Sequence, residues 1–127
     1  MKEKEITVVV VEPGKRPYVD SIAASLSGMQ KRVGGNIQAV YPFEEQVAIV
    51  CNEEGKLQGL PLNRALRNAE IGVYDVIAGT FFVADCSGED FGSLSKEQQE
   101  KYQRMFFFPE RFAIVNGHVT VTPYEAF

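Results

Sequence analysis

The chain has 127 residues, of which 45% are hydrophobic and 24% charged, and its formal net charge is −4. This length is typical of one domain and allows a buried core without disulfides or metal, and the composition excludes a disordered chain. Two cysteines and one histidine are too few for a structural zinc site, which needs about four such ligands. No apolar run approaches the roughly 20 residues that span a bilayer. We therefore expect a cytoplasmic, single-domain protein over residues 1–127, with a core at about 5–108.

The charges are distributed unevenly, because residues 41–110 carry twelve acidic and six basic side chains. Neutralising phosphates supplies most of the affinity for nucleic acids, so a surface that binds them is normally basic. Basic pairs at Lys15-Arg16 and Lys31-Arg32 flank a predicted helix, where they fit solvated helix ends. Direct binding to nucleic acid is therefore not expected.

The first half of the chain predicts a strand, a helix and a hairpin. The β-branched run at 6–11 is typical of a buried strand. A helix capped by Asp20 follows, because apolar residues recur at helical spacing, and Gly34-Gly35 ends it. The apolar residues are Ile22, Leu26, Met29 and Val33. Strands at 37–41 and 46–51 are close enough to form a hairpin.

Two segments in the middle of the chain give different signals. Residues 60–67 predict a loop leading into one helical turn, with Asn63 as its N-cap. Residues 76–84 form an uninterrupted apolar run, which predicts a strand in the middle of the sheet, covered on both faces.

The last third predicts a helix and a hairpin. Ser95 and Gln98 fit a capping box, in which each side chain satisfies the other residue's backbone donor. Asn116-Gly117 between two β-branched runs predicts a hairpin over 111–122. The whole order predicts an α+β fold: one mixed sheet of about four to six strands, two main helices packed on one face, and a C-terminal β-hairpin. The first helix would lie in a right-handed crossover between parallel strands.

One group of polar residues is a candidate binding site. Arg64 and Arg67 are three residues apart and would share a face of a helix, where two guanidinium groups can hold a carboxylate or phosphate. Asn63 and Asp75 lie nearby, and Gly79 would let a ligand approach the backbone. The alternative is structural, with Asn63 as a cap and the arginines in surface ion pairs.

Three consecutive aromatic residues, Phe106, Phe107 and Phe108, mark the end of the second helix. Three neighbours at a helix end cannot all face one core, so at least one is exposed unless the final hairpin covers it. We expect the hairpin to cover part of this patch. A homodimer interface is the alternative, which leaves the chain as a monomer or a homodimer.

Other catalytic patterns are weak. Gly14-Lys15 lacks the earlier glycine and the following Ser or Thr of a phosphate loop. His118 adjoins a hairpin turn, where a side chain is usually solvated. We therefore expect no catalytic residue, no metal and no cofactor. Acid–base chemistry by Tyr74, Asp75 or loop carboxylates is the weakest alternative.

Several segments resemble an uncharacterised family, domain of unknown function 3846. The similarity is most specific in residues 52–67 and 74–83, and residues 10–15 and 33–35 also fit. It covers roughly Val8 to Tyr102. Members occur in bacteria, phages and plasmids, so the resemblance implies an accessory protein of a bacterium or a mobile element. It implies no activity.

These observations favour a non-enzymatic module that binds an unknown protein partner. A domain that binds a small anion or a nucleotide-type ligand through residues 60–85 is the alternative, and both stay open at this point.

Overall fold

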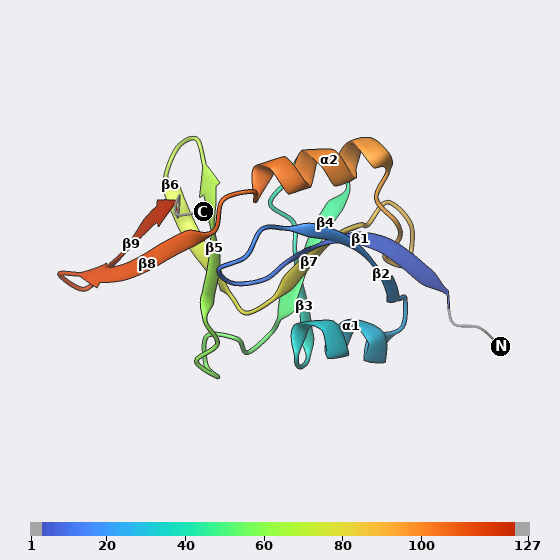
Figure 1. Cartoon of the computed structure of the whole chain (residues 1–127), viewed down its shortest axis with the longest axis horizontal. Helices are drawn as coiled ribbons and strands as arrows, with labels where there is room; N and C mark the ends of the chain where they lie inside the picture. Colours follow the sequence, from blue (N-terminus) through green and yellow to red (C-terminus); the bar gives the residue numbers. More distant parts are fainter. Residues whose placement is uncertain (1–3, 124–127) are drawn as a thin grey trace.

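The computed structural model describes residues 4–123, which form nine strands and two helices. In chain order these are β1 (Glu5–Val11), β2 (Tyr18–Ala23), α1 (Leu26–Val33), β3 (Ile37–Val40), β4 (Val47–Asn52), β5 (Leu62–Asn68), β6 (Gly72–Ala78), β7 (Phe81–Asp85), α2 (Lys96–Met105), β8 (Glu110–Val115) and β9 (His118–Pro123). Figure 1 shows a central sheet between two helices, with two hairpins at one end.

The central sheet has five strands in the order β2-β1-β7-β4-β3. Every strand pair in the described part of the chain is antiparallel. The predictions of a mixed sheet and of a parallel crossover are therefore wrong. β7 lies at the centre, as its apolar sequence predicts, and β3 and β4 form the predicted hairpin.

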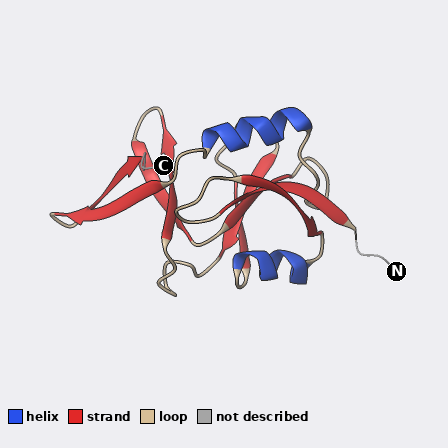
Figure 2. Ribbon diagram, viewed as in Figure 1, coloured by secondary structure: helices blue, strands red, loops and turns tan. Residues whose placement is uncertain are grey.

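The two helices cover opposite faces of this sheet, as Figure 2 shows. Val9 of β1 belongs to the same buried cluster as Tyr102 of α2, whereas Val10 packs in the other cluster with Met29 of α1. Neighbouring residues of a strand point to opposite faces, so a strand that is apolar throughout needs cover on both sides. The prediction that both helices pack on one face is wrong for this reason.

The segment before α1 is a strand and not the start of a helix. β2 pairs with β1 over six residues, and its Ile22 faces the core. Asp20 does not cap the helix, because it lies on β2 and forms an ion pair with Arg32 at 2.5 Å. Ser25 is the N-cap instead, and its hydroxyl accepts a hydrogen bond from Gly28 N–H.

The segment predicted to be a helical turn is also a strand. β5 pairs with β6, and Asn63 lies within β5 rather than at a helix start. The apolar run at 76–84 is divided into two strands that belong to different sheets. Gly79 lies between them with a φ of +83°, and its N–H donates to the Pro61 carbonyl at 2.7 Å. This left-handed residue turns the chain from the small β5–β6 sheet into the central one.

The C-terminal part contains α2 and a second small sheet. The capping box of Ser95 and Gln98 is present at the start of α2, as predicted. β8 and β9 pair on either side of Asn116-Gly117, whose φ values of +51° and +80° fit a type I′ turn. This hairpin extends away from the central sheet (Figure 1).

Gly79→Ala tests whether this turn requires glycine. A β-carbon at Gly79 would lie 2.8 Å from Leu60 Cδ1, whereas at Gly14, with a φ of +72°, it would meet nothing within 4 Å. Both alanine variants adopt left-handed backbone, which costs about 1–2 kcal/mol. We expect Gly79→Ala to lower the free energy of unfolding in urea more than Gly14→Ala. Equal losses would contradict this, because they would show that Leu60 moves aside at no cost.

Candidate functional site

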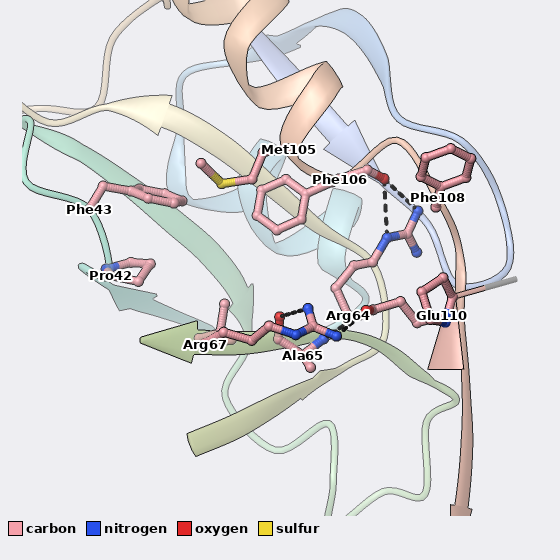
Figure 3. A pocket seen from close by; sticks show the side chains of 11 residues that line it. Pro42, Phe43, Arg64, Ala65, Arg67, Met105, Phe106, Phe108 and Glu110 are labelled. Carbon is pink, nitrogen blue, oxygen red and sulfur yellow. Dashed lines mark hydrogen bonds and ion pairs between the residues drawn. The ribbon is translucent and has the colours of Figure 1, made fainter. Parts of the chain in front are cut away.

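A cavity of about 600 Å³ opens beside the end of α2, between the β3–β4 loop, β5 and the C-terminal hairpin (Figure 3). Its lining residues are Pro42, Phe43, Arg64, Ala65, Leu66, Arg67, Met105, Phe106, Phe108, Glu110 and Pro123. Arg64 and Arg67 thus share one cavity with Phe106 and Phe108. The sequence suggested these two regions as alternatives, and the fold brings them together.

Arg64 is 1% exposed, and its guanidinium group joins three parts of the chain. Nε and Nη2 donate to the Phe106 carbonyl at 3.2 and 2.9 Å, and Nη2 also donates to the Lys15 carbonyl at 2.6 Å. Nη1 donates to the backbone oxygen of Asn63 at 3.2 Å and to its Oδ1 at 2.8 Å. All five N–H donors of the guanidinium group therefore have acceptors within the protein.

The acceptors around Arg64 are neutral oxygens. Burial lowers the pKa of Arg64 to about 10, and the charge of Glu110 opposes this shift. The guanidinium group therefore stays charged at neutral pH, and it is the cation best suited to an internal site because it is weakly hydrated. The hydrogen bonds of Arg64 hold three segments together: β5, the β1–β2 loop and the end of α2. This is a structural role.

Asn63 is fully buried and extends the same network. Its Nδ2 donates to the carbonyls of Val11 at 2.9 Å and Gly79 at 2.8 Å. These bonds fasten β5 to the end of β1 and to the β6–β7 turn. The predicted N-cap would have hydrogen-bonded the backbone of a helix that starts at Asn63. The Asn63 side chain does bond backbone groups, but these belong to remote segments of the chain.

Arg67 and Glu110 lie at the edge of β5 and pair at 2.5 Å. Glu110 also accepts the Ala65 N–H at 2.7 Å, and Arg67 Nη1 donates to the Ala65 carbonyl at 3.5 Å. Both backbone groups of Ala65 point away from β6 and are satisfied by side chains. The Glu110 side chain is 7% exposed and that of Arg67 is 47% exposed. The sequence does not predict the role of Glu110, since 43 residues separate it from Arg67.

The other two predicted site residues lie outside this cavity. Asp75 forms an ion pair with Lys56 at 2.5 Å and lines a separate cavity of about 350 Å³. Gly79 lies beside Leu60 at the β6–β7 turn. The five residues singled out from the sequence therefore do not converge. The expected shared helical face of Arg64 and Arg67 is also wrong, because both lie on β5.

The three phenylalanines at the end of α2 have different environments. Phe106 is buried, with its ring in edge contact with Phe81 at 5.3 Å between centroids. Phe107 and Phe108 are 37% and 50% exposed and contact each other, with centroids 5.0 Å apart. The Arg16 guanidinium lies 4.6 Å above the Phe107 ring. Two of the three rings thus reach the surface.

Glu45 holds the β3–β4 loop, which contributes Phe43 to the wall of the cavity, against α2. Its carboxylate accepts hydrogen bonds from the Tyr102 hydroxyl and from Lys101 Nζ, the latter at 3.1 Å. The Tyr102 hydrogen bond is the main reason why the pKa of Glu45 is lowered. Burial, followed by the same carboxylate, raises the pKa of Tyr102. The Phe43 and Tyr102 rings lie 4.7 Å apart, so the β3–β4 loop is held against α2.

The cavity offers apolar surface with polar groups that are already paired. Within residues 4–123, no three His, Cys, Asp or Glu side chains lie close enough to hold a metal ion. Cys51 is buried, Cys86 is half-buried, and both are free thiols. His118 is exposed on β9. Neither helix of the described part has the length and apolar character needed to cross a membrane.

Arg64→Ala is expected to destabilise the fold, because it leaves the Phe106 and Lys15 carbonyls without donors inside the protein. Unsatisfied buried groups and the resulting cavity together cost about 2–5 kcal/mol in the free energy of unfolding. The control is Lys56→Ala, which removes an ion pair with Asp75 that is exposed on both sides, at 57% and 45%, and is worth about 1 kcal/mol or less. Urea unfolding measures both variants. A smaller loss for Arg64→Ala than for Lys56→Ala would contradict the structural role of Arg64.

Tyr102→Phe is expected to raise the pKa of Glu45 toward its ordinary value while keeping the ring against Phe43. A lowered carboxyl pKa stabilises the fold above the ordinary pKa, and this contribution is lost as the pH falls through the lowered value. The variant should therefore be less stable than wild type near pH 7, and the difference should shrink as the pH falls through the lowered pKa of Glu45. Urea unfolding across this range, with carboxyl NMR of Glu45, measures the effect. A deficit independent of pH would argue against it.

Comparison with known proteins gives a family and no activity. No curated protein and no solved structure is significantly similar to the chain. The family described as Domain of unknown function (DUF3846) matches residues 6–107, which run from β1 to the end of α2 and leave β8 and β9 outside the match. This match confirms the resemblance found in the sequence. Since it covers well over half of the chain, the protein belongs to the family of domain of unknown function 3846.

Proposed function

We propose that this chain is a non-enzymatic protein-binding module that holds apolar side chains of a partner in the cavity beside α2. The observation that carries the proposal is the combination of apolar lining and paired polar groups in that cavity. Met105 and Phe108 are about half exposed at its mouth, at 49% and 50%. Aromatic residues, Met and Arg are enriched in the centres of protein interfaces. The resemblance further implies an accessory protein of a bacterium or mobile element.

Binding of a small anion or a nucleotide-type ligand is the alternative, and the contacts of the two arginines weigh against it. The five donors of Arg64 already have acceptors, so no N–H remains for a phosphate oxygen. Arg67 is paired with Glu110, and an anion would have to displace a carboxylate that is 7% exposed. Displacement would also free the Ala65 N–H. An apolar side chain can enter without disturbing these bonds.

Acid–base catalysis remains the weaker alternative. Tyr74 is 45% exposed on β6, at the point where the register between β5 and β6 shifts by one residue. Asp75 is engaged with Lys56 and with the Val76 N–H. An exposed tyrosine beside a carboxylate that is already paired is a poor basis for acid–base catalysis.

The proposal is tested by affinity enrichment from a bacterial lysate, using wild type and the cavity variants Met105→Glu and Phe108→Glu. A buried charge at an interface centre typically costs about 2 kcal/mol or more, so enrichment of a true partner should fall by at least about tenfold. The control is Leu26→Glu on α1, on the opposite face of the sheet, where the side chain is also exposed at 59%. This variant should retain the partner.

Two results would contradict the proposal. One is a partner that the cavity variants and Leu26→Glu retain equally, which would place binding elsewhere. The other is the absence of any enriched protein together with a thermal shift produced by phosphate or nucleotides and lost in Arg67→Ala. That outcome would favour the small-anion alternative.

A further inference from the structure

The outer edge of β9 has no partner strand in the described part of the chain. β9 pairs with β8 alone, and the two strands form a sheet of their own. A hairpin of two strands is marginally stable in water unless further strands or a helix support it. Figure 1 shows the hairpin extending away from the body of the protein. Its tip is exposed, with Ile114 at 79% and Val119 at 49%.

The turn determines which backbone groups face this free edge. In a two-residue hairpin loop, the residues that flank the turn, here Val115 and His118, exchange both backbone hydrogen bonds. Bonded and non-bonded pairs then alternate, so the N–H and C=O groups of Val119 and Val121 point outward. Pro123 fits this alternation, because it lies opposite Glu110 in a non-bonded pair and has no N–H to donate inward.

Most of this edge lacks the usual protection against pairing. Edge strands are commonly blunted by charged side chains, proline, bulges or covering segments, and β9 has only Pro123, at its C-terminal end. β9 carries no Asp, Glu, Lys or Arg, and its register with β8 runs without a bulge. The contrast is β5, where the side chains of Glu110 and Arg67 occupy the outward N–H and C=O of Ala65. Within residues 4–123, the edge of β5 is protected and the edge of β9 is open.

One face of the hairpin is apolar. Directly paired residues share a face, and two successive non-bonded pairs are Phe112 with Val121 and Ile114 with Val119. Phe112 and Val121 near the base are half-buried, whereas Ile114 and Val119 near the tip are exposed. The opposite face carries His118, Thr120 and Thr122 of β9. The open edge therefore borders an apolar strip.

We propose that β9 pairs antiparallel with β9 of a second copy of this chain, about a two-fold axis at Thr120. In this register Val119 of each copy lies opposite Val121 of the other, and every outward N–H and C=O of these valines finds a partner. A register centred on Val119 would place Val121 opposite the turn residue Gly117 and would therefore use fewer of these groups. A register centred on Val121 would place Val119 opposite Pro123, which lacks an N–H. The sequence Val119-Thr120-Val121 is itself symmetric about the axis, which favours a second copy over an unrelated strand.

The side chains fit this arrangement on both faces. On the apolar face, the pair Phe112 and Val121 of one copy lies beside the pair Val119 and Ile114 of the other. The exposed side chains near the tip of each hairpin therefore pack against the half-buried side chains near the base of the other hairpin. On the polar face, Thr120 meets Thr120 at the axis, and Thr122 meets His118. No charged side chain lies opposite its own copy. A C2 pairing of this kind also closes, because it consumes both free β9 edges and leaves none for a third copy.

The test uses the full chain and measures its mass in solution by sedimentation up to about 1 mM, the weak end of measurable affinities. We expect a concentration-dependent dimer. Thr120→Lys and Thr120→Glu each place like charges opposite one another at the axis, which should weaken the dimer about fivefold or more. Mixing the two variants should restore it as a heterodimer, detected by native mass spectrometry. In the wild-type dimer, the Val119 and Val121 amides should be protected from hydrogen exchange.

The control is Thr122→Lys, which puts the same charge on the same face of β9 but away from the axis. It should weaken the dimer much less than Thr120→Lys does. The proposal is overturned by a wild-type chain that stays monomeric at every concentration. It is equally overturned by a dimer that both lysine variants affect alike and that the Lys/Glu mixture fails to restore. The cavity variants Met105→Glu and Phe108→Glu should leave the dimer unchanged, which separates this interface from the proposed partner site.

Discussion

The buried guanidinium group of Arg64 is the constraint on which the arrangement of the small sheets depends. It holds the β1–β2 loop through Lys15, its own strand through Asn63, and the end of α2 through Phe106. The Phe106 carbonyl lies at the C-terminal end of α2, where the helix dipole favours a positive charge. Glu110 supplies a second favourable field. A buried charge is thus stabilised without a direct carboxylate partner, by oxygens that need donors of their own.

Short sequence patterns predicted the helices and strands that contacts between nearby residues stabilise. The β-branched run of β1, the β3–β4 hairpin and the capping box of α2 follow from side chains a few residues apart. β2 and β5 could not be found in this way. The segment Leu62–Asn68 contains good helix formers, and it is a strand because β6 pairs with it. Helical spacing correctly predicted α1 at Leu26–Val33 but was misleading for Ile22, which reaches the core from β2, a strand that pairs with β1.

The candidate site shows the same difference between what nearby residues in the sequence reveal and what only contacts between distant residues reveal. The sequence pointed to Arg64 and Arg67 through their three-residue spacing, and to the phenylalanines at the end of α2 because three consecutive rings cannot all face one core. Their convergence in one cavity depends on the tertiary fold, and so does the difference between a saturated Arg64 and a half-exposed Arg67. Glu110 carried no signal in the sequence, since its role arises only when β8 meets β5. The role of Glu110 becomes clear only when its partners Ala65 and Arg67 are known.

Glu110 also connects the cavity to the hairpin. It is the first residue of β8, it lines the cavity, and it satisfies the edge of β5 through Ala65 and Arg67. The base of the hairpin is therefore fixed by the same carboxylate that fills the polar part of the cavity. A ligand that displaced this carboxylate would loosen the base of β8, whereas one that occupied only the apolar part would leave β9 in place.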